Sequence, residues 1–388
     1  MTPLPKPTSS PPTEEELLAR LSRVQEKIST RGYDCYVSFD PVNIYYLTNS
    51  ANYVHERPFI LIIPPRGAPT MLAPVLELTH VKTKARCPLE YLTYYEFPAP
   101  DGENWNDIYP GAFPADPLVG IEGALPSAIQ ETTPGKTIID DLIDEVRLVK
   151  TEYEIARSVH ACDILNEGHR KLLEICRSGV LEVTVFSEVT TLMMMKIISD
   201  IPDANYIVTK PLAGVSPPST SHDPHFVLTP FIAMETGGPH VSGVAGQIDG
   251  YGMEIERSFF IETVPEAARR PFDVMMQARE RAFEMCVPGT VFSDIDRETR
   301  RIFIEAGYED NLLHRTGHGL GITGHEAPYL ALGDDRAAEP GMIVSIEPGI
   351  YIEGLGGFRH SDSVLITEDG PVSLTEAPDR LEDLVVTD

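Results

Sequence analysis

After residue 149 the chain alternates long helical patterns with short strand-like runs, an order that few architectures accommodate. Apolar residues recur at helical spacing along "KTEYEIARSVHACDILNEGHRKLLEIC", and further helical patterns cover residues 182–198, 265–286 and 292–306. Strand-like runs lie between and after them: "FIAMET", "GYGMEIERSFF", "MIVSIEPGIYI" and "DSVLIT". Helices on one side of a curved, mostly antiparallel sheet satisfy this order. The sequence therefore predicts an α+β domain over residues 149–388.

The upstream part of the chain predicts a separate α/β domain over residues 13–148. Thr13 and Glu16 form a capping-box pattern before an amphipathic helix. The runs "CYVSF", "NIYYLT" and "FILIIPP" follow, each apolar and bounded by Asp, Asn or Pro, and each is predicted as a strand. Residues 1–12 are rich in Pro and Ser and are predicted to form a disordered tail.

Charge and composition exclude several classes of protein. A formal net charge of −28 argues against nucleic-acid binding, because phosphates would be repelled. No run reaches the roughly 18 to 20 apolar residues needed to cross a bilayer, so we expect a cytoplasmic protein without membrane partners. The cysteines lack CxxC spacing and are predicted to be reduced packing residues: Cys35, Cys87, Cys162, Cys176 and Cys286.

Three segments concentrate the residues that could carry chemistry. Two are loops punctuated by Gly or Pro, "STSHDPH" and "HRTGHGLGITGHEAP", and the third is "SIEPG" at the end of an apolar run. A carboxylate in such a position must find a partner, or burial raises its pKa. These segments predict a site that includes His222, His225, His314, His318, His325 and Glu347.

Several motifs in the same order carry a family resemblance. "GHGLGITGHEAP", "PGMIVSIEPGIY" and "FRHSDSVLITEDG" resemble the "pita-bread" domain shared by Xaa-Pro peptidases, methionine aminopeptidases and creatinase. "LVKTEYEIARSVHACDI" resembles the start of that domain in prolidases and aminopeptidase P, and "YDCYVSFDPVNIYYLT" resembles the N-terminal domain of the same group. The resemblance spans nearly the whole chain and implies the fold, whereas the activity stays open because this fold carries several reactions.

The peptidases of this family hold two metal ions with two Asp, one His and two Glu, and the resemblance transfers only part of that set. His318 matches the His, Glu347 matches the first Glu, and Glu254 stands at the second Asp. Ser361 stands where the second Glu is expected, in the register fixed by Arg359 and Asp362. The paired site therefore lacks a bridging carboxylate.

The first Asp has two candidate positions in this sequence. One is Gly243, and the other is Glu235 followed by an inserted hairpin. Neither is an Asp, and hard divalent ions need bridging carboxylates of the right reach. We therefore expect no dinuclear site, while a single weakly held ion at Glu254, His318 and Glu347 stays open.

Where the chain departs from the peptidases it resembles creatinase, the metal-free member of the fold. The resemblance implies that His222 in "SHDP" transfers the proton and that Glu256 and Glu347 hold the substrate. The gapless match of "NIYYLTNSANYVHER" implies that Arg57 reaches a neighbouring subunit's site. Histidines at the positions of His318 and His325 line the same pocket in creatinase. The remaining predicted site residues are Tyr251 and Glu254.

These roles agree with the chemistry of the side chains. A neutral imidazole such as His222 exchanges protons near neutral pH, two carboxylates grip a cationic group, and Arg57 takes a carboxylate bidentately. The sequence thus predicts a metal-independent, creatinase-like hydrolase without a cofactor. Its substrate is expected to be a small amidino or amide-type compound cleaved at a C–N bond, and its assembly a homodimer with shared sites.

Two alternatives belong to other classes. One is an aminopeptidase P-like, Xaa-Pro-type metallopeptidase that tolerates Glu and Ser among its ligands. The other is a non-catalytic peptide-binding module, a use that this fold also has in histone chaperones. Metal analysis separates the metallopeptidase from the metal-free hydrolase, and a turnover assay separates either enzyme from the binding module.

Overall fold

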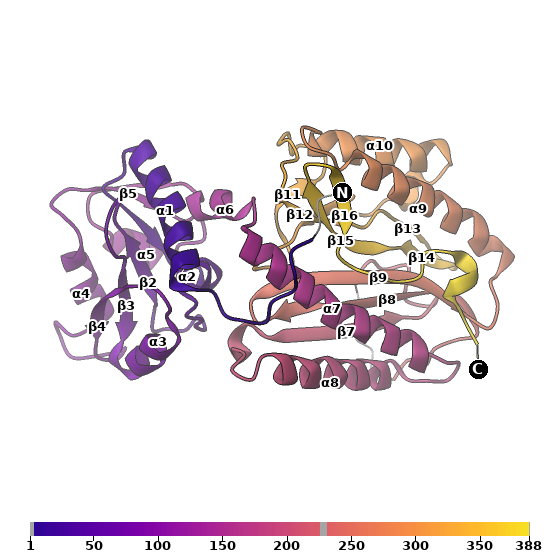
Figure 1. The fold of residues 1–388 in the computed structure, drawn as a ribbon, viewed down its shortest axis with the longest axis horizontal. Coiled ribbons are helices and arrows are strands. Elements are labelled where there is room, and N and C mark those ends of the chain that lie inside the picture. Colours follow the sequence, from indigo (N-terminus) through magenta and orange to yellow (C-terminus); the bar gives the residue numbers. More distant parts are fainter. Residues whose placement is uncertain (1–3, 226–230, 388) are drawn as a thin grey trace. The chain divides into compact units, whose positions relative to one another are not determined.

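The computed structural model describes residues 4–225 and 231–387. The chain divides into two compact units. One comprises Ser10–Arg147, and the other comprises the chain from Leu148 onward together with the segment before Ser10. Their relative placement is not determined, so each unit is considered by itself (Figure 1).

The N-terminal unit is a six-stranded sheet with helices, as predicted for an α/β domain. The strand order is β4-β3-β2-β1-β5-β6, and β1 pairs parallel with β5 and antiparallel with β2. The strands are β1 (Cys35–Ser38), β2 (Ile60–Ile63), β3 (Thr70–Pro74), β4 (Glu90–Tyr94), β5 (Leu118–Ile121) and β6 (Lys136–Ile139). The helices are α1 (Glu14–Arg31), α2 (Pro41–Thr48), α3 (Leu78–Lys84), α4 (Trp105–Ile108), α5 (Ser127–Thr132) and α6 (Leu142–Arg147).

Local sequence signals explain where α1 begins and why α2 is a helix. Thr13 caps α1, where its side chain accepts a hydrogen bond from the backbone N–H of Glu16 at 3.2 Å. The strand predicted at "NIYYLT" is wrong, because these residues lie in α2. Asp40 caps this helix and Pro41 occupies its first turn, a start signal that outweighs the β-branched and aromatic content.

The second unit is built on a nine-stranded, mostly antiparallel sheet. Its main path is β11-β10-β12-β15-β9-β8-β7, with β16 paired to β15 and β17 to β9, and β13 and β14 form a separate hairpin. The first strands are β7 (Lys210–Ser216), β8 (Gly237–Ile248), β9 (Tyr251–Ile261), β10 (Gly317–Gly319) and β11 (Glu326–Leu330). The others are β12 (Ile343–Ile346), β13 (Gly349–Ile352), β14 (Gly356–Arg359), β15 (Ser361–Thr367), β16 (Gly370–Ser373) and β17 (Val385–Val386).

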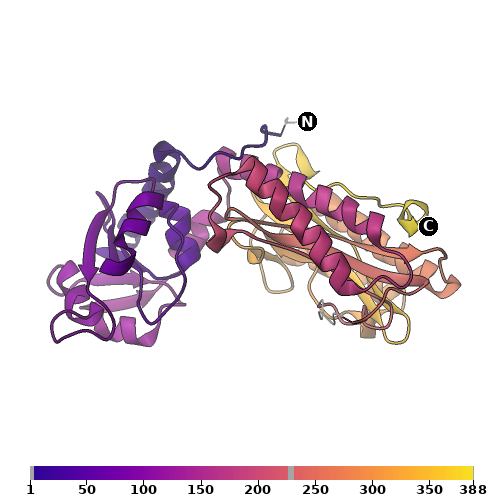
Figure 2. The same ribbon diagram turned by 90° about the horizontal axis from the view of Figure 1, so that it is seen from below.

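Four long helices pack on this sheet in the α+β arrangement predicted. They are α7 (Glu152–Ile175), α8 (Glu182–Asp200), α9 (Glu266–Met285) and α10 (Phe292–Glu305). Figure 2 shows α7 and α8 lying across the part of the sheet formed by β7, β8 and β9. Buried residues of α9 and α10, among them Ala282 and Ile295, share a core with Val344 of β12 and Val364 of β15.

Two further sequence expectations can be compared with the structure. The strand predicted at "FIAMET" is wrong, since only an isolated bridge joins Ala233 to Leu181. Within the predicted tail, Thr8 donates a backbone hydrogen bond to Ala156 of α7 at 3.2 Å, and Arg157 donates to the carbonyl of Ser9 at 3.0 Å. These contacts hold this part of the tail against α7. No helix of the described residues is long and apolar enough to span a membrane.

Candidate active site

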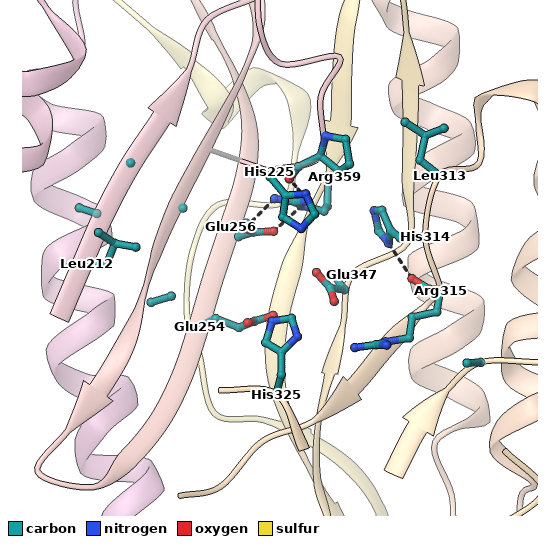
Figure 3. Close-up of a pocket in the computed structure, with 16 residues that line it drawn as sticks. Leu212, His225, Glu254, Glu256, Leu313, His314, Arg315, His325, Glu347 and Arg359 are labelled. Atoms are coloured by element: carbon teal, nitrogen blue, oxygen red, sulfur yellow. Dashed lines mark hydrogen bonds and ion pairs between the residues drawn. The ribbon is translucent and has the colours of Figure 1, made fainter. Parts of the chain in front are cut away.

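A pocket of about 720 Å³ opens on the sheet of the second unit. This volume is typical of small-molecule sites and is too small for a folded partner. Figure 3 shows its polar side chains converging from strands far apart in sequence. The histidine and charged residues that line it are His225, Glu254, Glu256, His314, Arg315, His325, Glu347 and Arg359.

Strand β9 supplies two of the carboxylates. Glu254 and Glu256 are separated by one residue, so the period of a strand points both to the same face. Across the ladder, Glu254 pairs with Ala245 and Glu256 with Gly243 on β8. Because these neighbours are small, the pocket lies open above the two carboxylates.

His318 on β10 lies against two carboxylates. Its Nε2 is 3.0 Å from Oε1 of Glu347 and 3.7 Å from Oε1 of Glu254. Its Nδ1 lies 3.1 Å from the carbonyl of Gly319, which can only accept, so Nδ1 carries the hydrogen. In the neutral ring the lone pair of Nε2 therefore faces the carboxylates, and this arrangement requires a cation or a proton between them.

Burial and neighbouring charges set the protonation of this cluster. Burial lowers the pKa of His318, but Glu254 and Glu347 outweigh it and raise that pKa to about 9. Burial and the charge of Glu347 raise the pKa of Glu254 to about 7. Burial also opposes ionisation of Glu347, but the hydrogen bond and charge of His318 lower its pKa to about 2.

A second nitrogen donor completes a possible metal centre. The His325 ring stacks on the His318 ring with centroids 3.7 Å apart. Donor atoms of Glu254, His318 and His325 all lie within 4.8 Å of one another. One carboxylate oxygen and two imidazole nitrogens form a donor set that suits a transition-metal dication such as Zn²⁺. The residues therefore fit one ion.

The other end of the pocket holds a buried ion pair. Arg359 Nη2 donates to Oε1 of Glu256 at 2.7 Å, and Nε lies in close contact with Oε2, so the guanidinium grips the carboxylate with two nitrogens. Arg359 Nη1 donates to the carbonyl of Pro224 at 2.7 Å. Only 6% of Arg359 and 9% of Glu256 is exposed. Figure 3 shows this pair on the side of the pocket away from His325.

A hydrogen-bonded chain orients the Arg359 end. Arg359 Nη1 donates to the Tyr351 hydroxyl at 2.9 Å, and this hydroxyl lies 2.7 Å from Nε2 of His314. His314 Nδ1 lies 2.7 Å from the carbonyl of Arg315 and must donate to it. Nε2 of the neutral His314 ring consequently accepts a hydrogen bond from the Tyr351 hydroxyl. Burial lowers the pKa of His314, in agreement with a neutral ring.

The structure brings most of the predicted site residues together. Glu254, Glu256, His318, His325 and Glu347 surround one pocket, with His318 held behind Glu347 and His325. Their predicted roles as catalytic and substrate-binding groups stay predictions.

Three predicted site residues lie elsewhere. His222 is exposed and absent from the described pocket lining, which includes His225 three residues later. Tyr251 is buried against Tyr153, with ring centroids 6.4 Å apart. Arg57 belongs to the N-terminal unit, where it pairs with Glu56 and Glu96.

The register of β8 decides between the two candidate positions for the missing Asp. Gly243 lines the pocket and pairs with Glu256. Glu235 is exposed, lies before β8, and accepts a hydrogen bond from Ser219 at 2.8 Å. Of the two candidates only Gly243 lies in the described pocket, and the expected hairpin insertion falls largely within β8, whose ladder with β9 shifts register between Gly237 and His240.

Two functional candidates were missed by the sequence analysis. Arg359 entered it only as a marker of register, and Arg315 was not considered. Arg315 lines the pocket with its guanidinium 4.6 Å from the ring centroid of Tyr329. The signal for Arg315 was its place in "HRTGH", between two histidines assigned to the site.

Comparison with known proteins agrees with the two units and with their fold. A family model described as metallopeptidase family M24 matches residues 156–368. A model described as creatinase/prolidase N-terminal domain matches residues 20–149. The predicted pita-bread architecture is confirmed: an α/β N-terminal domain precedes a C-terminal domain with a curled sheet.

Named relatives are dipeptidases. A Xaa-Pro dipeptidase of Pyrococcus furiosus is 28% identical over 368 residues, covering 93% of this chain and 99% of the relative. The putative dipeptidase YkvY of Bacillus subtilis is 28% identical over 381 residues, covering 95% and 99%. The solved prolidase from Pyrococcus furiosus superposes with a TM-score of 0.76 at 26% identity, covering 91% of this chain and 99% of that one.

These findings contradict the predicted activity. The metal-independent, creatinase-like hydrolase of amidino compounds is wrong, because the relatives are named Xaa-Pro dipeptidase, putative dipeptidase and prolidase, and the matching family model is a metallopeptidase family. The three-donor cluster at Glu254, His318 and His325 also removes its physical basis. Loss of a bridging carboxylate disables a paired site, whereas a single ion needs no bridge. The proton-transfer role predicted for His222 in that reaction falls with it.

Proposed function

The chain belongs to metallopeptidase family M24, and from this we propose that it hydrolyses the peptide bond of Xaa-Pro dipeptides. The observation that carries the proposal is the cluster of Glu254, His318 and His325 beside Glu347 in a pocket of dipeptide size. The names of the relatives support the preference for proline.

One metal ion has a set of ligands in this pocket. Glu254, His318 and His325 would hold it, since their donor atoms lie close together and two of the side chains are buried. When bound, such an ion polarises the scissile carbonyl and makes water a stronger nucleophile. Ser361 donates a hydrogen bond to Oε1 of Glu254 at 2.8 Å, which fixes the orientation of this carboxylate.

Glu347 is the carboxylate available to accept the proton of the attacking water. Glu254 belongs to the metal donors and Glu256 is engaged with Arg359, which leaves Glu347 toward the middle of the pocket (Figure 3). A positioned carboxylate of this kind contributes typically about 10²- to 10⁴-fold to the rate.

Arg315 is suited to bind the free carboxylate of a dipeptide. Its guanidinium stacks on Tyr329 and, unlike that of Arg359, forms no ion pair with a carboxylate among the described residues. It lines the same pocket as Glu347. A planar guanidinium binds a carboxylate through two parallel hydrogen bonds, and a carboxylate at this point marks the end of the substrate.

A substrate panel tests the proposed activity. Alanylproline should be hydrolysed in the presence of Mn²⁺, Co²⁺ or Zn²⁺, whereas prolylalanine and alanylalanine should react far more slowly. Turnover is measured as free proline released over time. Binding of alanylproline without any release under all three metals would contradict the proposal and favour the peptide-binding module.

Substitution of Arg315 should weaken substrate binding selectively. We expect Arg315→Ala to raise KM for alanylproline by about 10- to 100-fold, because one charge-assisted contact contributes about 1.5–3 kcal/mol. The kcat should change much less. Alanylproline amide, which lacks the carboxylate, provides the comparison: its hydrolysis should be slow in the wild type and insensitive to the substitution.

A matched control is Arg336→Ala, which removes a guanidinium that contacts Asp334 and does not line the described pocket. It should leave KM unchanged. Equal losses of alanylproline and alanylproline amide hydrolysis in Arg315→Ala would show that Arg315 does not read the carboxylate.

The predicted homodimer is retained as a proposal. Sedimentation velocity of the full chain should show a species of twice the mass of the 42.8 kDa protomer. Arg57→Ala should then reduce turnover only if a neighbouring subunit's Arg57 reaches the site. A fully active monomer would exclude a role of Arg57 in a second subunit.

A further inference from the structure

Glu256 on β9 lies between Gly243 on β8 and Ser361 on β15, the two positions at which a metal-binding carboxylate was expected and is absent. On one side Glu256 pairs with Gly243 of β8, and on the other it pairs with Ser361 of β15. Gly243, Glu256 and Ser361 therefore form one row across the sheet. The carboxylates missing from the outer strands are replaced by a single carboxylate on the central strand.

The carboxylate of Glu256 is already paired with a cation, the guanidinium of Arg359. Arg359 contacts both oxygens of Glu256 and is itself held by Tyr351 and the carbonyl of Pro224. A buried charge pair with its remaining donors satisfied is stable, whereas either partner alone would be costly. An incoming metal ion would have to displace a guanidinium that already contacts Glu256, the Tyr351 hydroxyl and the carbonyl of Pro224.

The carboxylate of Glu254 is also limited in its capacity to bind a second ion. Oε1 of Glu254 accepts the hydrogen bond of Ser361, so that lone-pair region is less available to a second ion. Gly243 contributes no side-chain donor atom from the facing strand. A bridging arrangement would need a carboxylate at position 243 or 361.

The charges of the pocket agree with a single ion. Glu254, Glu256 and Glu347 contribute three negative charges, and Arg359 and Arg315 contribute two positive charges. With one divalent ion and neutral histidines, the pocket carries a single excess positive charge. A second divalent ion would raise that excess to three in a largely buried site, which is unfavourable.

We propose that this site binds one divalent metal ion and that the Arg359–Glu256 ion pair stands in place of a second. This inference rests on the proposed function in one respect: the bound ion is the cofactor of the reaction. It predicts a peptidase site with a built-in guanidinium, in which the charge of the second cation is supplied by the chain itself.

Metal stoichiometry tests the inference without relying on activity. The full chain is treated with chelator, desalted and titrated with Mn²⁺ by calorimetry, and the bound metal is measured by elemental analysis after gel filtration. The wild type should bind one equivalent. The triple variant Gly243→Asp, Glu256→Thr, Ser361→Glu restores the outer carboxylates, removes the partner of Arg359, and should bind two.

A control variant separates the effect of position from that of added charge. Leu212→Asp adds a carboxylate on β7 at the pocket wall, outside the row, and should still bind one equivalent. Circular dichroism and thermal unfolding verify that each variant is folded. If the triple variant does not fold, the number of Mn²⁺ equivalents bound by the wild type tests the one-ion inference by itself.

The outcomes are distinct from those of the peptidase assay. Two equivalents in the wild type would overturn the one-ion inference even if alanylproline is cleaved. No bound equivalent in a protein that cleaves alanylproline would also overturn it. One equivalent in a protein that cleaves no dipeptide would support the inference and refute the proposed function.

Discussion

Replacing His318 with alanine should reduce alanylproline turnover by at least about 10²-fold and weaken Mn²⁺ binding in parallel. His318 is the only described residue whose ring nitrogen lies within 4 Å of both Glu254 and Glu347, so its loss leaves two facing carboxylates without a ligand between them. Loss of residues that merely support metal ligands already costs about 10- to 100-fold. Steady-state kinetics and Mn²⁺ titration measure the two effects.

His160→Ala is the matched control for this substitution. His160 is also a buried histidine of the same unit, but it pairs with Asp200 at 3.1 Å and does not line the described pocket. Its replacement should leave metal binding and turnover nearly unchanged. Retention of wild-type turnover by His318→Ala, with the metal still bound, would exclude His318 as a ligand.

Replacing Asp362 with asparagine should destabilise the protein by about 3–5 kcal/mol at neutral pH, the cost of breaking a buried ion pair. Asp362 is 1% exposed and accepts hydrogen bonds from Arg257 at 2.9 Å and Arg279 at 3.0 Å. Both guanidinium groups would lose their buried partner. Asp379 lies near both of them but is partly exposed, so it compensates only in part.

The pH dependence of unfolding gives this prediction a second readout. Burial alone would raise the pKa of Asp362, but Arg257 and Arg279 hold it below its ordinary value. A depressed pKa means that the stabilisation is present above the unfolded pKa of about 3.9 and is lost as pH falls through the folded one. The difference between wild type and Asp362→Asn should therefore shrink below about pH 4.

Chemical denaturation at several pH values measures both effects. Glu298→Gln, which removes a carboxylate paired with Arg281 and Arg301 on the surface of α10, is the control and should cost much less. A loss in Asp362→Asn no larger than that in Glu298→Gln would show that the buried cluster contributes little to stability.

Much of the fold could be predicted from local patterns. Periodicity located α7 to α10 and most strands of the second unit, because their apolar spacing is long and regular. The six residues of "NIYYLT" are too few for periodicity to separate helix from strand, and their helical start signal at Asp40 and Pro41 was overlooked. "FIAMET" has strand composition, yet among the described residues its strand pairing is limited to the isolated bridge between Ala233 and Leu181.

The sequence was sufficient to select many of the candidate site residues, but not to predict how the strands arrange them. Residue type and loop context identified His318, His325 and Glu347, since buried carboxylates and clustered histidines are rarely structural alone. The row formed by Gly243, Glu256 and Ser361 depends on register between three strands, which spacing along one strand cannot give. The pairing of Glu256 with Arg359 was missed for the same reason.

The wrong functional prediction has a physical origin. Two absent carboxylates were taken to mean that no metal is needed, although they exclude only a bridge between two ions. The donors that remain at Glu254, His318 and His325 come from three different strands or loops, and only the fold shows that they meet. Resemblance to creatinase at His222 then favoured a metal-free reaction.

Metal-dependent turnover of alanylproline tests the central claim most directly. Chelator-treated protein is assayed before and after stepwise addition of Mn²⁺, and free proline is measured at each step. The account predicts negligible release without metal and a rise that is complete at about one equivalent, as expected for tight binding at a single site. Release that is unaffected by chelation, or that never appears at any metal concentration, would contradict it.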